Sequence, residues 1–401
     1  MAKGKDLKPH IGIFGRRNSG KSSIINLMVD QEVAIVSSEP GTTTDPVKKS
    51  MEITGIGPAV IVDTAGIDDQ GKLGEKRIQK TFNVLKIIDC AILVISYNQF
   101  GSYEKNLIDR FTEFELPYII VHNKSDLEPV SDATLKSISE NSDVEVVDFT
   151  TIHNTLLPLL IAALKRIIPE TVWQKPSLLA GLIDKGDLVL LVTPIDEAAP
   201  QGRMILPQVM TIRDVLDNEA ICVVLKETHL EHYFNNQMPK PTLVITDSQV
   251  FDFVNKIIPP DMPLTSFSIM FARMKGDFEQ YLAGTPKLST LSDGDKVLIL
   301  ESCTHQVSCE DIGRQKLPQW IREFTGKDIS FDVVPGLNDI PQLTQYQMVI
   351  QCGGCVVTRR QLLNRLKPAV DAQIAVSNYG LAIAYINSIF DRVTAPFRLN
   401  K

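Results

Sequence analysis

A phosphate-binding motif lies near the start of the sequence. The stretch GRRNSGKS has glycine, lysine and serine at the positions of the pattern G-x-x-x-x-G-K-S/T. It follows the apolar run HIGIF and precedes SSIINLMVD, so a strand leads into it and a helix opens from it. In such a loop, backbone N–H groups and the helix N-terminus hold phosphates, while the lysine reaches the β- and γ-phosphates as a catalytic group. The predicted site for a nucleoside triphosphate comprises Gly15, Gly20, Lys21, Ser22 and Ser23, and Ser22 offers its hydroxyl to Mg²⁺.

Two further motifs indicate which nucleotide binds. The motif DTAG follows the apolar run AVIV, so Asp63 can hold Mg²⁺ through water and the Gly66 N–H can meet the γ-phosphate. The motif NKSD follows the apolar run YIIVH. Asp126 can accept hydrogen bonds from the guanine N1–H and 2-amino groups, a donor pair that adenine lacks. With Asn123 and the stem of Lys124 contacting the ring, the motifs predict GTP as the ligand.

Alternating strand and helix patterns divide the chain into three parts. Residues 1–170 alternate buried apolar runs with amphipathic stretches, which predicts the doubly wound α/β sheet of a P-loop GTPase domain. A polar, proline-bearing linker follows. Residues 176–262 are expected to form a small α/β domain without a chemical motif. Residues 263–401 alternate again, which predicts a Rossmann-like α/β domain.

The composition of the 401-residue chain limits the class of protein. Its net charge of −7 argues against a nucleic-acid partner, which would favour a basic excess. No apolar run reaches the roughly 18 residues of a membrane span, so no membrane partner is expected. The basic stretch MAKGKDLKPH lacks the apolar core of a secretory signal. We therefore expect a cytoplasmic protein.

The cysteines indicate a second chemical site. Six cysteines in a chain of this length do not resemble a disulfide framework, and cytosolic thiols at short spacing more often bind metal. Cys90 and Cys222 lie inside apolar strand-like runs and are interpreted as buried core residues. The remaining candidates form two groups, which are Cys303, His305 and Cys309, and the CGGC pair Cys352 and Cys355.

Strand ends are expected to bring the two cysteine groups together. The apolar runs 296–301 and 348–351 each precede one group. If these strands are parallel, both loops leave the same sheet edge, where open α/β sheets gather their sites. A helix that starts near 357–366 would favour an anionic thiolate centre at its N-terminus. Zinc and an iron–sulfur cluster both fit three thiolates, and a redox dithiol Cys352/Cys355 is a third interpretation.

The nucleotide motifs resemble a known family. GRRNSGKS, PGTTTD, DTAG and NKSD are similar to the GTPases that include Era and TrmE. The resemblance implies that Thr43 is the switch threonine on Mg²⁺ and that Asn18 ligates K⁺ between the phosphates. Ile67 stands where many GTPases have a water-orienting glutamine, whereas Glu75 lies where related enzymes have a catalytic glutamate, so Thr43 and Glu75 join the P-loop lysine as catalytic candidates. Residues 148–151 depart from the usual Ser-Ala base loop, which leaves that contact open.

The whole layout resembles a more specific family. A GTPase domain, a motif-free part and then C-T-H … C-G-G-C are similar, over essentially the full chain, to the HydF family of [FeFe]-hydrogenase maturation GTPases. Members usually read C-x-H, a long gap and H-C-x-x-C, and Gln351 stands where histidine is common. The resemblance implies a [4Fe-4S] cluster on Cys303, Cys352 and Cys355, with His305 as a candidate fourth ligand. Rival fourth ligands are Cys309, Glu310 and Asp311.

The resemblance also implies a function. Such a protein is a GTPase scaffold and carrier that holds the diiron precursor of the hydrogenase H-cluster and delivers it to apo-[FeFe]-hydrogenase. Two radical-SAM maturases supply the parts, the middle domain makes a homodimer, and GTP hydrolysis times partner exchange. The alternative is a ribosome- or tRNA-associated Era/TrmE-like GTPase with structural zinc. A GTP-dependent redox enzyme that uses the CxxC pair is a further alternative.

Overall fold

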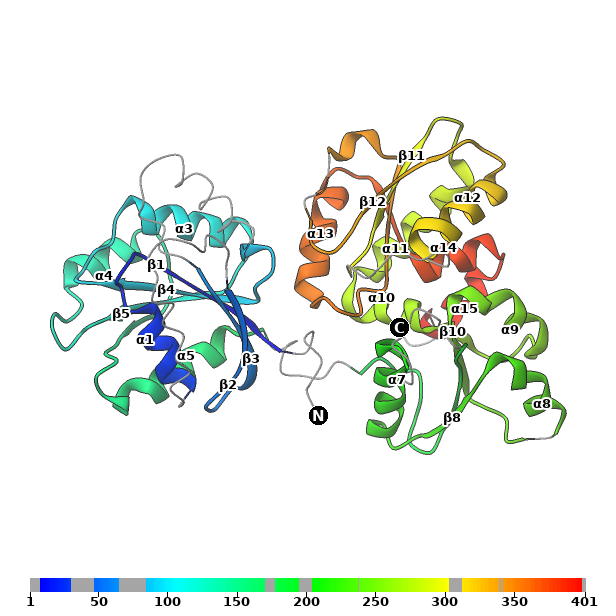
Figure 1. Ribbon diagram of the computed structural model, residues 1–401, viewed down its shortest axis with the longest axis horizontal. Coiled ribbons are helices and arrows are strands. Elements are labelled where there is room, and N and C mark those ends of the chain that lie inside the picture. Colours follow the sequence, from blue (N-terminus) through cyan, green and yellow to red (C-terminus); the bar gives the residue numbers. More distant parts are fainter. Residues whose placement is uncertain are drawn as a thin grey trace. The chain divides into compact units, whose positions relative to one another are not determined.

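The structure is a computed structural model of the chain with two compact units. It describes residues 8–29, 47–64, 84–169, 177–194, 204–236, 238–302, 312–338, 340 and 342–398. The units are Met1–Lys175 and Pro176–Lys401, and each is described by itself (Figure 1). No helix within these described ranges combines the length and the apolarity that crossing a membrane requires.

The first unit contains a doubly wound sheet, as predicted. In its described part the strand order is β2-β3-β1-β4-β5-β6, and every neighbouring pair is parallel except β2 and β3. The strands are β1 (His10–Gly15), β2 (Val47–Ile53), β3 (Gly57–Asp63), β4 (Cys90–Ser96), β5 (Tyr118–Asn123) and β6 (Val146–Asp148). The helices are α1 (Lys21–Val29), α3 (Ser102–Glu113), α4 (Asp132–Ser139), and α5 (Leu157–Ile167), which a 3₁₀ turn (Asn154–Leu156) precedes.

Helices cover both faces of this sheet. Figure 1 shows α1 and α5 on one face and α3 and α4 on the other. The strands β1, β4 and β5 are continuous apolar runs with every residue buried, as expected for parallel strands between two helix layers. On the α3 side, the ring of Phe111 packs edge-on against Phe14 and also contacts Tyr118. Because β1, β3, β4 and β5 are parallel, their carboxyl ends lie at one edge of the sheet.

The second unit begins with a parallel sheet of order β10-β9-β7-β8. Its strands are β7 (Leu188–Val192), β8 (Ile221–Leu225), β9 (Leu243–Thr246) and β10 (Leu264–Ser266). Its helices are α7 (Leu206–Asp217), α8 (Leu230–Asn235), α9 (Phe251–Ile257) and α10 (Phe267–Lys275), and 3₁₀ turns lie at Glu227–His229 and Ser248–Val250. Because β10 pairs with β9, this sheet extends a few residues beyond the domain limit of residue 262 that the sequence analysis placed.

A second parallel sheet follows in the same unit, of order β12-β11-β13-β14. Its strands are β11 (Lys296–Leu300), β12 (Ser330–Val334), β13 (Met348–Gln351) and β14 (Ala375–Asn378). The accompanying helices are α11 (Phe278–Gly284), α12 (Leu317–Thr325), α13 (Arg359–Asp371), α14 (Tyr379–Ile386) and α15 (Phe390–Arg398). Shorter turns are the 3₁₀ helices Thr285–Thr290 and Leu343–Gln345 and the π-helix Ile312–Lys316.

One hydrophobic core joins the two sheets of the second unit. It contains Leu190 and Val244 from the first sheet together with Leu298 and Val349 from the second, all fully buried. The helix α10 connects them, since it begins directly after β10 and its Ser268 hydroxyl donates to Asn378 Oδ1 at 3.1 Å. The two sheets therefore form one packed body.

Candidate nucleotide and cysteine sites

The phosphate loop lies where its motif predicts, between a strand and a helix. β1 ends at Gly15 and α1 begins at Lys21. Gly15 and Gly20 have φ angles of +148° and +92°, which side-chain-bearing residues rarely adopt. A Cβ at position 20 would lie 2.0 Å from Asn123 Nδ2, and one at position 15 would lie 2.3 Å from the Val94 carbonyl oxygen. Both glycines are thus required by backbone conformation and by close neighbours.

The lysine of this loop hydrogen-bonds to the loop itself. Lys21 Nζ donates to the carbonyl oxygens of Gly15 at 2.9 Å and Arg16 at 2.8 Å. The Arg16 guanidinium in turn donates to both carboxylate oxygens of Glu104 at 2.7 and 2.9 Å, and Glu104 also accepts the Gly101 N–H at 2.8 Å. Glu104 is 1% exposed, so a buried ion pair fastens the phosphate loop to α3. Sequence reasoning missed this pair, because the two residues are far apart in the chain.

The two described Mg²⁺ candidates line one small pocket. Ser22 at the start of α1 and Asp63 at the end of β3 face it together with Lys49 of β2. Burial raises the pKa of the Asp63 carboxyl above its usual value, and the nearby charges of Lys21 and Lys49 partly oppose that shift. Mg²⁺ would supply the charge that a buried carboxylate needs. Of the other predicted residues on this side, Thr43, Gly66, Ile67 and Glu75 lie outside the described residues.

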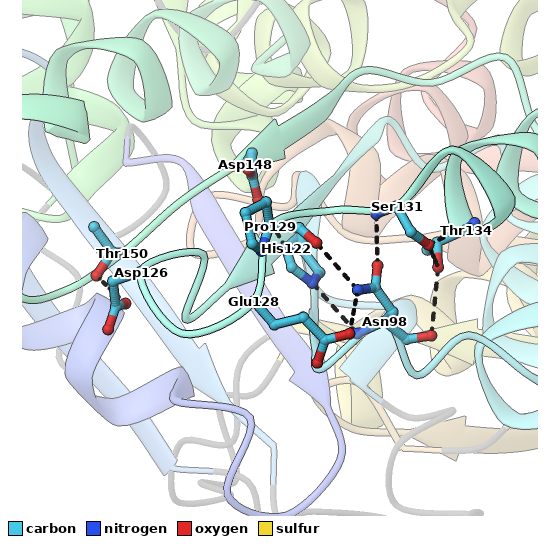
Figure 2. Close-up of polar contacts among 9 residues, drawn as sticks. All are labelled: Asn98, His122, Asp126, Glu128, Pro129, Ser131, Thr134, Asp148 and Thr150. Carbon is cyan, nitrogen blue, oxygen red and sulfur yellow. Dashed lines mark hydrogen bonds and ion pairs between the residues drawn. The ribbon is translucent and has the colours of Figure 1, made fainter.

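The residues predicted to recognise guanine lie at the end of β5 and directly after it, next to the loop that follows β6. Asn123 is 1% exposed, and its Nδ2 donates to the Ser19 carbonyl oxygen at 2.9 Å, which ties the NKSD motif to the phosphate loop. Thr150 Oγ1 donates to Asp126 Oδ1 at 2.5 Å, as Figure 2 shows. The base loop therefore holds Asp126 although it lacks the usual Ser-Ala form. The threonine at position 150 was the sequence signal from which this contact with Asp126 could have been predicted.

Figure 2 also shows a polar network that sequence reasoning missed. His122 is fully buried, and its Nδ1 lies 2.7 Å from Asp148 Oδ1 while its Nε2 accepts the Asn98 N–H at 3.4 Å. The Asn98 side chain donates to Glu128 Oε1 at 2.8 Å and accepts the Ser131 N–H at 2.8 Å. The loop after β4 is thereby tied to the loop after β5. These bonds fix the backbone on both sides of the NKSD motif.

The carboxyl ends of β11 and β13 meet, as predicted for the cysteine groups. The two strands are parallel neighbours with Leu300 opposite Gln351, and the Cys352 N–H donates to the Leu300 carbonyl oxygen at 2.9 Å. The Ser302 N–H donates to Cys352 Sγ at 3.1 Å, and the Ser302 hydroxyl lies 3.1 Å from the same sulfur. Ser302 directly precedes Cys303 in the sequence. The predicted residues that lie outside the described ranges here are Cys303, His305, Cys309, Glu310 and Asp311.

Gln351 supports the sulfur through hydrogen bonds. Its side chain is fully buried, and Nε2 donates to Ser302 Oγ at 3.0 Å and lies 3.5 Å from Cys352 Sγ. Gln351 Oε1 and the buried Tyr281 hydroxyl have no hydrogen-bond partner within the described part of the chain. Burial raises the Tyr281 pKa far above its usual range, and the Cys352 charge adds to that rise. Buried polar groups without partners are typical of a site that receives a further group.

One arginine, Arg365, adds positive charge near this sulfur. Arg365 of α13 is 8% exposed and donates to the carbonyl oxygens of Glu301 at 2.5 Å and Val334 at 2.6 Å. Burial lowers the Arg365 pKa from its usual value, and the nearby Cys352 opposes that shift. Arg314 pairs with the buried Glu301 carboxylate at 2.8 Å, and in the sequence these two residues lie on either side of the first cysteine group. Within the described residues, however, no three His, Cys, Asp or Glu side chains form a metal-binding group.

Comparison with known proteins identifies the parts of the chain. Residues 10–124 match the family described as 50S ribosome-binding GTPase. Residues 178–276 match the hydrogen maturase F dimerization domain, and residues 279–396 match the hydrogen maturase F tetramerization domain. The last two matches together span more than half of the chain. The chain belongs to the hydrogen maturase F family.

Similar proteins support the GTPase part of this hydrogen maturase F chain. The tRNA modification GTPase MnmE of Nitrosomonas europaea is 35% identical over 154 residues, which are 38% of this chain and 33% of that protein. GTPase Era of Caldicellulosiruptor saccharolyticus is 24% identical over 237 residues, 55% of this chain and 78% of that protein. The chain thus spans only about a third of that MnmE relative. A crystal structure of Aquifex aeolicus Era bound to GDP and AlF₄⁻ shares 17% identity with a TM-score of 0.35, and the match covers 54% of this chain and 92% of that one.

The family assignment confirms several sequence predictions. The chain is a GTPase with a P-loop α/β domain, and two further α/β parts follow in hydrogen maturase F order. Both hydrogen maturase F domains are named for oligomerisation, which supports an oligomeric protein. The part that the sequence analysis assigned to cluster binding is the one matched by the tetramerization domain.

Proposed function

We propose that this GTPase binds a [4Fe-4S] cluster in its C-terminal part and carries the diiron precursor of the H-cluster to apo-[FeFe]-hydrogenase. The observation that carries the proposal is the convergence of the two cysteine-bearing strand ends at one sulfur. Ser302 donates its N–H to Cys352 Sγ, and the chain reaches Cys303 one residue later. Cys303, Cys352 and Cys355 would ligate the cluster, and His305 is the proposed fourth ligand.

The chemistry of the described residues fits such a group. Iron–sulfur clusters are held by thiolates and are stabilised by N–H and O–H donors to sulfur. The sulfur of Cys352 accepts the Ser302 N–H at 3.1 Å and has the Gln351 amide nitrogen at 3.5 Å, while its thiol donates to Ser302 Oγ at 3.1 Å. A cluster in this place would supply an iron site to which an external ligand of the diiron precursor can attach.

On the nucleotide side, we infer that Ser22, Thr43 and Asp63 bind Mg²⁺ and that Glu75 assists hydrolysis. The shared pocket of Ser22 and Asp63 supports the Mg²⁺ assignment. The γ-phosphate would order the segments around Thr43 and Gly66, and hydrolysis would release them. GTP hydrolysis then times the exchange of partners, which are radical-SAM maturases and the hydrogenase.

We also propose that Asn18 ligates K⁺ between the phosphates. Asn18 adopts a φ of +60° within the phosphate loop, a conformation that asparagine tolerates better than most residues. GTP hydrolysis should therefore be faster in KCl than in NaCl at equal ionic strength, and Asn18→Ala should remove the difference. Equal rates of the unaltered chain in both salts would contradict the assignment.

The homodimer is proposed to form through the edge of the middle sheet. β8 is an edge strand, and its Ile221 and Val224 side chains are 54% and 41% exposed. Leu216 at the end of α7 is 57% exposed as well. An exposed apolar edge strand is a template for pairing with a second chain. Val224→Lys should shift the protein toward monomer in analytical ultracentrifugation, with Phe253→Lys on the exposed face of α9, away from β8, as a comparison.

Anaerobic reconstitution with iron and sulfide tests the main proposal. A brown protein with several irons per chain, lost in Cys355→Ser, is expected. Zinc at one per chain without iron would instead favour a ribosome- or tRNA-associated GTPase with a structural metal. Coexpression with a hydrogenase and its other maturases, with and without Cys355→Ser, then tests delivery through hydrogen evolution.

A further inference from the structure

A buried lysine contacts the loop that carries Cys352 and Cys355. Lys275 is the last residue of α10 and is only 4% exposed. Its Nζ donates to the carbonyl oxygens of Gly354 at 2.9 Å, Val357 at 2.8 Å and Cys355 at 3.4 Å. An ammonium group removed from water is costly unless all its protons are hydrogen-bonded, and three carbonyls match its three donors. The backbone of this one loop therefore holds the cation.

These bonds determine which way the loop's N–H groups point. In a trans peptide unit the C=O and the following N–H point in opposite directions. Because the carbonyls of Gly354 and Cys355 face Lys275, the N–H groups of Cys355 and Val356 are turned to the opposite side. Successive backbone N–H groups in a turn, such as residues 355 and 356 here, form an anion-binding concavity. Lys275 thus imposes a backbone arrangement suited to an anionic group.

Gly354 makes this arrangement sterically possible. Its φ is +67°, in the left-handed region, and a Cβ there would lie 2.4 Å from Leu362 Cδ1. A side chain at position 354 would therefore push the loop away from α13. With glycine, the loop passes between α10 and α13 and keeps its carbonyls on Lys275.

The lysine also places a cationic group near the thiols. Its Nζ lies 3.4 Å from the carbonyl oxygen of Cys355 itself. The Arg365 guanidinium acts on the same site, since it influences Cys352 electrostatically. Positive charge in a low-dielectric region stabilises thiolates and any anionic centre that they ligate.

We propose that Lys275 is the positioning residue that shapes the Cys352–Cys355 loop to receive an anionic, thiolate-ligated metal centre. The inference rests on the proposed iron–sulfur function and adds a residue with no sequence signal, because Lys275 lies far from both cysteines in the chain. Cys352 and Cys355 would bind the metal directly, whereas Lys275 acts through the backbone and through its charge.

Hydrogen exchange of the metal-free, full-length chain tests the shaping of the loop. Lys275→Met should raise amide exchange in residues 352–358 by about tenfold or more, because the loop loses its anchor. The control Lys256→Met removes an exposed lysine of α9 that pairs with Asp252 and should leave this exchange unchanged. Lys275→Gln keeps two N–H donors but no charge, so its loop exchange rate should lie between those of the unaltered chain and Lys275→Met. It serves as the test variant if Lys275→Met does not fold. Unaltered exchange in the loop would overturn the proposal.

Iron binding tests the link to the metal centre. After anaerobic reconstitution with iron and sulfide, Lys275→Met should bind iron about tenfold more weakly than the unaltered chain. Its cluster should also show a more negative reduction potential, because reduction adds negative charge near a site that has lost a cation. GTP hydrolysis should stay unchanged.

The two failures are distinguishable. An unaltered chain that takes up no iron would overturn the proposed function and the metal part of this inference, while hydrogen exchange still decides the shaping of the loop. An unaltered chain that binds iron, with Lys275→Met equal to it in affinity and potential, would overturn the role of Lys275 alone.

Discussion

The nucleotide end of the first unit and the cysteine end of the second unit occupy equivalent places in two parallel α/β sheets. Both lie beyond the carboxyl ends of neighbouring parallel strands. At the nucleotide end the functional groups hydrogen-bond to one another, since Lys21 binds loop carbonyls and Asp126 accepts from Thr150. At the cysteine end, donors from Ser302 and Gln351 surround one sulfur.

The two sites therefore differ in which hydrogen bonds must break when a ligand binds. GTP must displace the internal partners of Lys21, so the phosphate loop exchanges one set of hydrogen bonds for stronger, charge-assisted ones. The sulfur of Cys352 already has N–H donors from Ser302 and Gln351 in place, so a metal ligated by this sulfur would keep them. Substitutions at the nucleotide end should therefore change binding and turnover, and those at the cysteine end should change metal affinity and potential.

The largest difference between the two sites is expected from Lys21→Ala, which should affect GTP turnover and leave iron binding unchanged. Loss of the ammonium at the β- and γ-phosphates should reduce GTP turnover by about a hundredfold to a thousandfold. Iron content after reconstitution should match that of the unaltered chain, because the two sites lie in separate units. Lys136→Ala, on the exposed face of α4, is the matched control. Equal loss of turnover and of iron would break the modular description.

The next effect concerns the buried histidine of the guanine-binding end. His122→Leu should lower the free energy of local opening at β5 and β6 by about 2 kcal/mol, because the Asn98 N–H and the Asp148 carboxylate lose their partner. Hydrogen exchange of peptides from both strands measures this change. His153→Leu replaces an exposed histidine of the same unit as the control. If both variants exchange alike, the network in Figure 2 contributes nothing to order.

A smaller effect is expected at Thr150, which holds the Asp126 carboxylate that we propose binds guanine. Thr150→Val removes the hydroxyl that donates to Asp126 and should weaken GTP binding by about tenfold, or about 1.4 kcal/mol. A titration with fluorescent GTP measures the change in Kd. Thr151→Val alters the neighbouring threonine and should leave Kd within about twofold. A normal Kd for Thr150→Val would show that Asp126 needs no internal support.

The smallest effect is expected at the cysteine end. Ser302→Ala removes the hydroxyl beside Cys352 Sγ but keeps the backbone N–H donor. The cluster should form with normal iron content and a slightly more negative reduction potential, equivalent to less than about 1 kcal/mol. Ser289→Ala, whose hydroxyl pairs with Tyr385 in the same unit, is the control. Loss of iron in Ser302→Ala alone would mean that the hydroxyl is needed for assembly.

Contiguous motifs and strand patterns predicted much of the molecule. The P-loop, the strand that ends at Asp63 and the parallel alternation all follow from local sequence, and the structure contains them. The sequence also predicted that the ends of the strands before Cys303 and Cys352 would meet, because an apolar run precedes each cysteine. In the structure these two strands are parallel neighbours. Roles for individual residues at both sites stay predictions.

Long-range polar contacts could not be predicted. Glu104, His122 and Lys275 are charged or titratable residues in otherwise ordinary helices and strands, and each gains its role from a partner far along the chain. The spacing of two residues in the sequence does not show whether they form such a pair, because this depends on the direction and burial of their side chains in the fold. The sequence placed the limit of the middle domain at residue 262, and it carried no local signal that residues 264–266 would join the sheet by pairing with β9.

The helix α10 has a mechanical consequence. Its first turn is capped by Ser266 of the edge strand β10, and its last residue is the lysine that grips the cysteine loop. Nine residues of α-helix form a stiff rod about 13 Å long. A movement of the β10 edge of the middle sheet would therefore be transmitted along this helix to the backbone around Cys355. The position of β10 and the geometry of the loop that carries Cys352 and Cys355 are coupled in this way through α10.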